Sequence, residues 1–246
     1  MITKSALDTI SVMRAIDSEY RVHTGFTASR FYKIFYSRID PAPLLVLGVN
    51  PGGNPENPSS LISASSSFFE NYEHDYVDCS YTIQRMMLPL LVYVLKATPD
   101  QIRAIPKTNL AFRRSPSEDG FKKCHGMSLA DGMKESKPWL ERIIRHVSPK
   151  MILLETMKPE RFASLYGGIE WSRAQPIADD LTANHRGAMV RAFTAKELPI
   201  GVLDTTIPVV AIGHPSVGSF SKDSVWQAIT ASVSAVCRAY DIRASR

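Results

Sequence analysis

Two short polar segments, each directly after an apolar run, carry the side chains with the clearest chemical potential. Asn50 lies in the segment 48–53 (GVNPGG), which follows the apolar run 44–47. His214 opens a His-Pro-Ser segment after the apolar run 207–212. An amide can hold a water molecule, and an imidazole can donate a hydrogen bond or a proton. Together the two groups suit the cleavage of a bond to a neutral leaving group.

Both segments also have structural interpretations, because an amide can cap a turn and a histidine can be satisfied at a strand end. The segment 48–53 is not a phosphate loop, since no lysine follows it, and it lacks the glycine spacing of a dinucleotide site. Pro51 stiffens the turn, while Gly52 and Gly53 allow a close approach of the backbone. Asn50 is therefore the one polar side chain that the loop presents.

The surrounding elements determine whether these two segments can meet. Apolar runs and helical stripes alternate along the chain, which favours parallel crossovers and a three-layer α/β/α sandwich. In such a sheet the loops at the carboxyl ends of the strands share one crevice, where Asn50 and His214 can meet. Strands are predicted at 44–49, 108–112, 151–154, 187–193 and 209–213, and helices at 1–20, 82–96, 139–147, 159–166 and from 223 onward.

The length of 246 residues favours one domain spanning 1–246, with residues 1–43 as an extension packed on it. Within this extension the segment 25–39 is rich in aromatic and basic residues. We interpret it as a packed strand or helix that covers the sheet edge, with a DNA-facing surface as the alternative.

Composition places the chain among ordinary globular proteins, with 44% hydrophobic and 22% charged residues. The formal charge of +5 suits a polyanionic partner without identifying one. No apolar run is long enough to cross a bilayer, and residues 1–20 lack a signal-peptide core, so we expect a cytoplasmic protein without a membrane partner. The cysteines, Cys79, Cys124 and Cys237, are odd in number and scattered, which argues for a reducing compartment. The histidines show no metal-ligand spacing, so no metal is expected.

The two segments resemble the signature motifs of the uracil-DNA glycosylase superfamily. GVNPGG is similar to the first motif of the mismatch-specific and single-strand-selective branches, and His-Pro-Ser is similar to the second. Between them, Thr108-Asn109-Leu110 is similar to the segment that reads the base. Residues 137–154 are similar to a segment of the thermostable branch, except that this chain has Glu155 where that branch has glycine. The resemblance implies a four-stranded, mostly parallel sheet and a monomeric DNA glycosylase without cofactor or metal.

The resemblance also implies a role for each matching residue. Asn50 would position the attacking water, and His214 would donate a hydrogen bond to the pyrimidine O2 as the base leaves. Asn109 would pair with the Watson–Crick edge of the flipped base, and Phe68 or Phe69 would stack on it. The expected DNA contacts are Pro51, Gly52, Gly53 and Ser216 at the backbone, Val217 as the wedge that fills the vacated stack, and, from their charge, Arg113 and Arg114.

Gly52 bears on the substrate. The uracil-only branch has a tyrosine two residues after its first-motif acid, where it blocks substituents on the pyrimidine C5, and the corresponding position here is Gly52. The resemblance therefore implies a monofunctional glycosylase for uracil or a 5-modified pyrimidine in DNA. Its role would be base-excision repair or, for bulky phage bases, antiviral defence. Two alternatives stay open, a non-catalytic DNA-binding relative and a small-molecule hydrolase or nucleosidase, although the chain has no GxSxG nucleophile elbow.

Overall fold

A central sheet with helices on both faces forms the computed structural model, which describes residues 4–26, 31–53, 74, 76–78, 82–156, 158, 160–166, 190–195, 207–213 and 223–243. The sheet has five strands in the order β2-β1-β3-β5-β4. Four of them are parallel, as expected, and β4 adds an antiparallel edge beside β5. The strands are β1 (Leu44–Gly48), β2 (Lys107–Asn109), β3 (Met151–Glu155), β4 (Val190–Ala195) and β5 (Ile207–Ile212).

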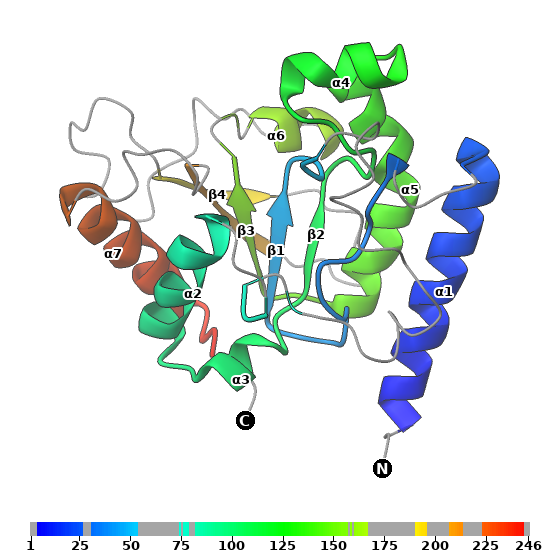
Figure 1. Cartoon of the computed structure of the whole chain (residues 1–246). Coiled ribbons are helices and arrows are strands. Elements are labelled where there is room, and N and C mark those ends of the chain that lie inside the picture. Colours follow the sequence, from blue (N-terminus) through cyan, green and yellow to red (C-terminus); the bar gives the residue numbers. More distant parts are fainter. Residues whose placement is uncertain are drawn as a thin grey trace.

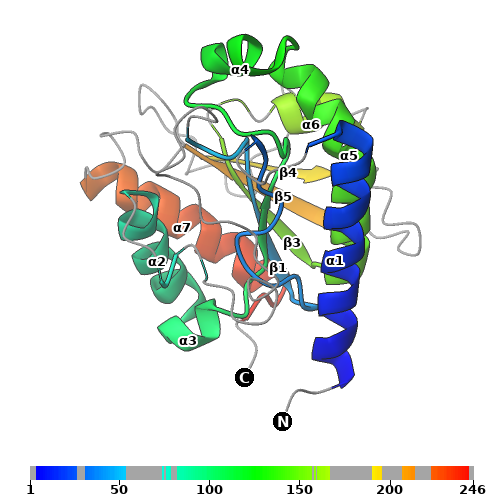
Figure 2. The ribbon, with the colours of Figure 1, turned by 45° about the vertical axis from the view of Figure 1, so that its right-hand side comes forward.

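Alternate residues of the strands pack on opposite faces of the sheet. Leu45 and Leu47 of β1 join the core formed with α1 (Lys4–Thr24) and α5 (Leu129–Val147). Leu44 and Val46 join the core formed with α2 (Thr82–Leu95) and α7 (Asp223–Ala239). Figures 1 and 2 show these helix pairs on the two sides of the sheet. Burial on both faces explains why the parallel strands read as continuous apolar runs.

The predicted elements are present with shifted ends. β2 is shorter than the predicted strand 108–112, because the chain beyond Asn109 leaves the regular ladder. The amides of Leu110 and Ala111 still donate to the carbonyls of Gly48 and Val49 (2.9 and 2.8 Å). The strand predicted at 187–193 is β4, and it runs antiparallel to β5. α5 begins well before its predicted stripe because Ser128 caps it, its hydroxyl accepting from the amide of Asp131.

Two helices were not predicted, because each is too short to show a helical period. α3 (Pro99–Ile102) begins with a capping box between Thr98 and Gln101. α4 (Glu118–His125) is capped by Ser117 and ends at Gly126, whose φ of 68° favours glycine. α6 (Glu160–Tyr166) matches its prediction closely.

The segment after α1 packs along β2. The amides of Lys33 and Tyr36 donate to the carbonyls of Phe112 and Lys107, and the Thr108 hydroxyl donates to the carbonyl of Ile34. Tyr32, Ile34 and Phe35 are buried. Residues 31–39 therefore cover the sheet edge, as the packed interpretation expected, and they do not offer a broad DNA-facing surface.

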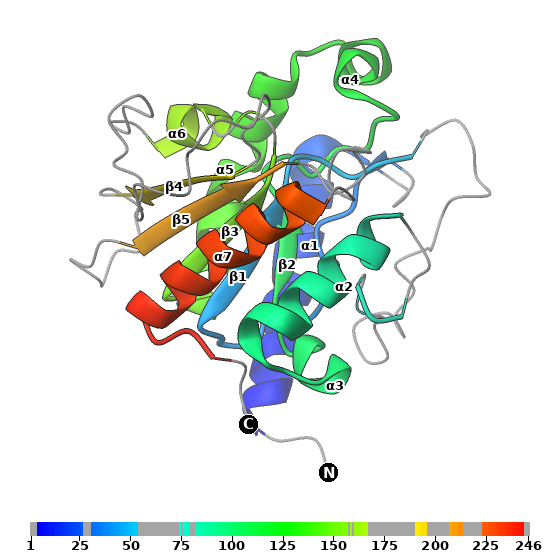
Figure 3. The same cartoon turned by 90° about the vertical axis from the view of Figure 1, so that its left-hand side faces the viewer.

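The parallel strands point toward α4 and α6 (Figures 1 and 3). The first turn of α1 and the last turn of α7 lie toward the opposite end of the molecule (Figure 1). Within the described ranges, no helix combines the length and apolar character needed to span a bilayer.

Candidate functional site

Parallel strands place their last residues at one edge of the sheet, which we call the carboxyl edge. Asn109 ends β2, opposite Gly48 of β1, and Asn50 follows Gly48 by two residues. Glu155 ends β3, opposite Ile212 of β5. Residues from three adjacent strands are thus brought together where the sequence analysis expected a crevice.

Several predicted site residues lie outside the described residues, so their placement stays a prediction. They are Phe68, Phe69, His214, Ser216 and Val217. The described chain does reach Gly213, directly before His214, at the carboxyl end of β5. Only β3 separates β5 from β1 in the sheet.

The amide of Asn50 is fixed by two hydrogen bonds. Its Nδ2 donates to the carbonyl of Pro51 (3.0 Å) and to Oγ of Ser115 (2.9 Å). The Ser115 hydroxyl donates onward to the carbonyl of Ser117 (2.7 Å), so its oxygen accepts from Asn50. Both amide protons of Asn50 are used, which leaves the oxygen Oδ1 as an acceptor that no described residue fills.

The side-chain amide of Asn109 lies over the backbone of Gly48, its partner in the neighbouring strand. A Cβ built on Gly48 would be 2.1 Å from Oδ1 of Asn109 and 3.5 Å from Oε2 of Glu155. Only glycine at position 48 leaves room for the amide. Asn109 is 4% exposed, and its Nδ2 has no hydrogen-bond partner among the described residues. A buried donor left unpaired costs about 1–3 kcal/mol, so this nitrogen is suited to a bound acceptor.

A buried polar cluster flanks Asn109 on the same face of the sheet. Glu155 is 2% exposed and accepts a hydrogen bond from the hydroxyl of Tyr76 (2.5 Å). Its Oε2 forms a salt bridge with Nζ of Lys107 (3.3 Å). The ammonium of Lys107 lies 4.1 Å from the ring centre of Tyr76. A carboxylate, an ammonium and a phenol therefore converge below the amide of Asn109.

Sequence reasoning did not assign a role to this cluster. The available signals were a charged residue closing the otherwise apolar strand MILLE and a lysine opening β2. Tyr76 had no signal, because its contact with Glu155 joins residues far apart in the chain. Ser115, which fixes Asn50, was missed for the same reason.

The three residues after Asn50 differ in burial and in backbone conformation. Pro51 is buried, and its carbonyl accepts from the amide of Ser115 (3.0 Å), so it stabilises the loop from within. Gly53 has a φ of 100°, which favours glycine. Gly52 is exposed, and a Cβ there would meet no atom of the described residues within 4 Å. The position predicted to admit C5 substituents therefore faces open space on the described side.

The structure shows partners within the protein for Arg113 and Arg114, and their DNA contacts stay a prediction. Arg113 forms a bidentate pair with Glu135 (2.6–3.2 Å), and both side chains are 12% exposed. Burial alone would raise the pKa of Glu135, but the hydrogen bonds from Arg113 and Tyr20 lower it. Arg114 is buried and donates to the carbonyls of Gly52 (3.1 Å) and Tyr32 (3.4 Å).

α4 is anchored above the carboxyl edge at both ends. At its start, Glu118 pairs with Arg161 and Lys158, and the hydrogen bond from Arg161 lowers the pKa of Glu118 to about 2. At its end, Nε2 of His125 donates to the carbonyl of Arg114 (2.6 Å). Burial lowers the pKa of His125, which favours the neutral ring.

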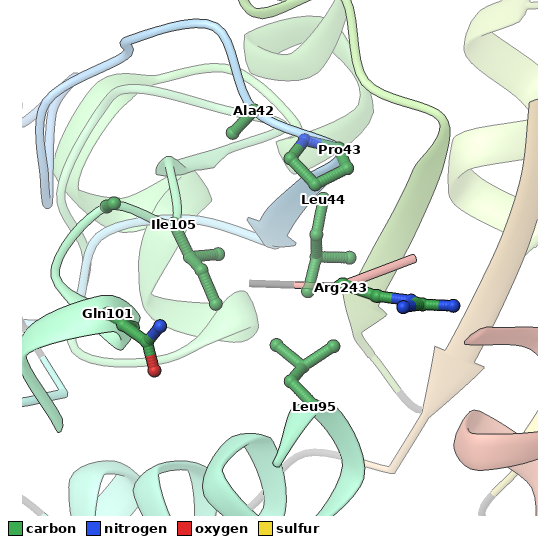
Figure 4. Close-up of a pocket in the computed structure, with 8 residues that line it drawn as sticks. Ala42, Pro43, Leu44, Leu95, Gln101, Ile105 and Arg243 are labelled. Atoms are coloured by element: carbon green, nitrogen blue, oxygen red, sulfur yellow. The ribbon is translucent and has the colours of Figure 1, made fainter. Parts of the chain in front are cut away.

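Two further observations bound the site. A small cavity among Leu44, Leu95 and Ile105 lies at the opposite edge of the sheet, near the start of β1, and has room for about one water molecule (Figure 4). In the described part of the chain, no group of three or more His, Cys, Asp or Glu side chains is arranged to hold a metal ion.

Comparison with known proteins adds no family assignment. No protein-family model matches the chain, and no curated protein has significant sequence similarity to it.

Proposed function

We propose that this protein is a monofunctional DNA glycosylase of the uracil-DNA glycosylase type, which removes uracil or a 5-modified pyrimidine. One observation carries the proposal: a buried amide with an unpaired donor, Asn109, lies one strand from an anchored amide, Asn50. The first suits the edge of a flipped base, and the second suits a water molecule beside the sugar. The motif order supports the same assignment.

The reaction breaks the C1′–N1 bond of the target nucleotide. A water molecule that donates a hydrogen bond to Oδ1 of Asn50 attacks C1′. The bonding electrons leave with N1 of the base, and a proton from the water ends on the departing base. The products are an abasic site and a free base. His214, in its predicted role, donates to the pyrimidine O2 and stabilises the charge that develops there.

Oriented dipoles are the main catalytic device in this scheme. Cleavage develops positive charge on the sugar and negative charge on the base, and an asparagine cannot act as a general base. One well-placed donor in such a site contributes a rate factor of about 10²–10³. The fixed geometry of Asn50, held by Ser115 and the Pro51 carbonyl, reduces the reorganisation needed to place the water.

Positive charge near the carboxyl edge favours DNA over a free nucleoside as the substrate. The chain carries a formal charge of +5, and Lys122 and Lys123 are exposed in the last turn of α4, whereas its acidic residues, Glu118 and Asp119, lie in the first turn. Figure 1 shows α4 beyond the tips of the parallel strands. A lysine set against a phosphate releases a counterion, which makes DNA binding depend on salt.

The test uses oligonucleotides that each carry one candidate base, in single-stranded and duplex form. Incubation with the protein is followed by hot alkali, which cleaves abasic sites. We expect cleavage of at least one substrate, and a loss of about 10²-fold in rate for Asn50→Ala with DNA affinity retained, because the attacking water is no longer positioned. Val22→Ala is the control variant, because Val22 is 81% exposed on α1 and takes no part in the site.

Other outcomes would identify the alternatives. DNA binding without cleavage of any base would indicate a non-catalytic relative. Release of bases from free nucleosides but not from DNA would indicate a nucleosidase. Unchanged cleavage by the Asn50→Ala variant would remove Asn50 from the mechanism.

A further inference from the structure

We propose that the base pocket selects a pyrimidine with an exocyclic amine at C4, a cytosine-type base, through the pair Asn109 and Glu155. The inference rests on the glycosylase function proposed above and specifies its substrate. It concerns a buried carboxylate that the mechanism does not use and that the resemblance does not supply.

Asn109 and Glu155 face the same space from opposite sides of β1. A Cβ on Gly48 would lie 2.1 Å from the amide oxygen and 3.5 Å from the carboxylate oxygen, so both oxygens border the space over that glycine. Gly48 lacks the side chain that would separate them. A planar base edge that reaches the amide therefore also meets the carboxylate.

The amide alone does not choose between a keto and an amino base. It has one donor side and one acceptor side, and rotation of the amide lets it pair with either base edge. The carboxylate in a salt bridge only accepts. Two acceptors, Oδ1 of Asn109 and Oε2 of Glu155, suit the two protons of an exocyclic amine, while Nδ2 of Asn109 donates to N3. The O4 of uracil would instead face a carboxylate oxygen without a proton between them, whereas a cytosine amine is a recognised partner of Glu and Asp.

Glu155 is held in place for this role. Oε1 accepts from the Tyr76 hydroxyl, and Oε2 pairs with Lys107. A carboxylate has about four lone-pair positions, so these two contacts leave room for an incoming donor. The Lys107 ammonium also lies 4.1 Å from the ring centre of Tyr76 and 5.3 Å from that of Tyr36, and these contacts help to keep it beside Glu155.

Selection against ordinary cytosine has to come from elsewhere in the pocket, because unmodified cytosine occurs throughout DNA. Among the described residues, none fills the space beside Gly52, which suits a substituent at C5. The substrate class that combines both features is a 5-substituted cytosine.

The test compares oligonucleotides in matched pairs that differ only at C4 of the target base. The pairs are cytosine with uracil, 5-methylcytosine with thymine, and 5-hydroxymethylcytosine with 5-hydroxymethyluracil. Released bases are identified by mass spectrometry, and abasic sites are cleaved with alkali. We expect the amino member to be released faster in each pair that reacts. Faster release of the keto members would overturn this inference and leave the glycosylase function standing, whereas no release from any substrate would overturn both.

Glu155→Gln tests the residue itself. We expect the amino-over-keto rate ratio to fall roughly 10- to 100-fold, as for loss of a hydrogen bond to a charged group. Because this variant leaves Lys107 without its carboxylate, the double variant Lys107→Met/Glu155→Gln is measured beside it, with a thermal melt of each. A purely structural role would lower both rates in parallel and leave their ratio unchanged, and that result in a folded variant would overturn the proposal.

Discussion

Gly48→Ala is the sharpest perturbation that the structure offers. The new Cβ would lie 2.1 Å from Oδ1 of Asn109, well inside the 3.4 Å at which ordinary van der Waals contact begins. The nearest obstacle is a side chain, so Asn109 has to move while the strand pairing of β1 and β2 is kept. The substitution therefore displaces the proposed base reader without removing any functional group.

The displacement sets the size of the effect. Oδ1 of Asn109 has to retreat by about 1 Å, and a misplacement of that size costs about 10²-fold in rate when a positioning group is involved. Overpacking a buried site also costs about 1–3 kcal/mol of stability. For a chain of this length, each kcal/mol lowers the melting temperature by about 2–4 °C.

The assay is a double-mutant cycle of Gly48→Ala with Asn109→Ala, measured by base release and by thermal melting. If the clash with Asn109 is the cause, Gly48→Ala lowers activity in the wild type but adds little loss when Asn109 is already alanine. Its cost in stability should also shrink in that background. Gly132→Ala is the matched control, because its Cβ would lie 2.4 Å from the Phe121 ring, which takes no part in the site. It should lower the melting temperature while activity per folded molecule is kept.

Additive losses of activity would refute the reasoning. So would full activity of Gly48→Ala in a protein that is folded to the same extent. Either result would mean that the amide of Asn109 does not need its place above Gly48 in order to read the base.

Three further predictions follow from the loop and from α4. Gly52→Tyr should abolish the release of 5-substituted bases, because the tyrosine ring would fill the space beside Gly52 that admits the substituent. The release of unsubstituted bases should be retained. Equal losses of rate on both kinds of base would contradict this prediction. Arg113→Ala should lower stability by about 1–3 kcal/mol and leave the salt dependence of DNA binding unchanged, since its guanidinium pairs with Glu135; a shallower salt slope would restore the predicted DNA contact. Burial lowers the pKa of His125 in the folded protein. As the pH falls below 6.5, the imidazole of the unfolded chain is therefore protonated before that of the folded chain. Protonation favours the unfolded state, so the folded protein loses stability below this pH. Melting temperatures measured over about pH 7.5–5.5 should therefore fall less for His125→Gln than for the wild type.

The carboxyl edge illustrates how far sequence reasoning reached. The apolar runs before Asn50 and Glu155 predicted buried strands, because a parallel strand covered on both faces needs apolar residues at every position. Glycine and proline after β1 predicted the turn that presents Asn50. The short helix α4 was missed, because eight residues are too few to show a period.

Charged residues were the least predictable, because a charge has the same appearance in the sequence whether it faces solvent or a partner. Arg113 was expected to contact DNA, and the structure shows that Glu135 of α5 pairs with it inside the protein. Lys107 opens a strand and could have been a surface residue, but it lies buried against Glu155. The partner in each case is distant in the chain, and no local pattern encodes it.

By itself, the sequence determined that this chain forms a mainly parallel sheet with polar side chains at the strand ends, since hydrophobic periodicity and turn residues act locally. Only the tertiary structure decided that β1 lies between β2 and β3, which places Asn109 and Glu155 on either side of Gly48. Strand order depends on how the crossovers and both helical layers pack together, and those contacts join residues across the whole chain. The proposed pocket chemistry follows from that order. Gly48 has no side chain, and this leaves a space that two polar side chains border only because Asn109 and Glu155 lie on the strands to either side and face the same side of the sheet.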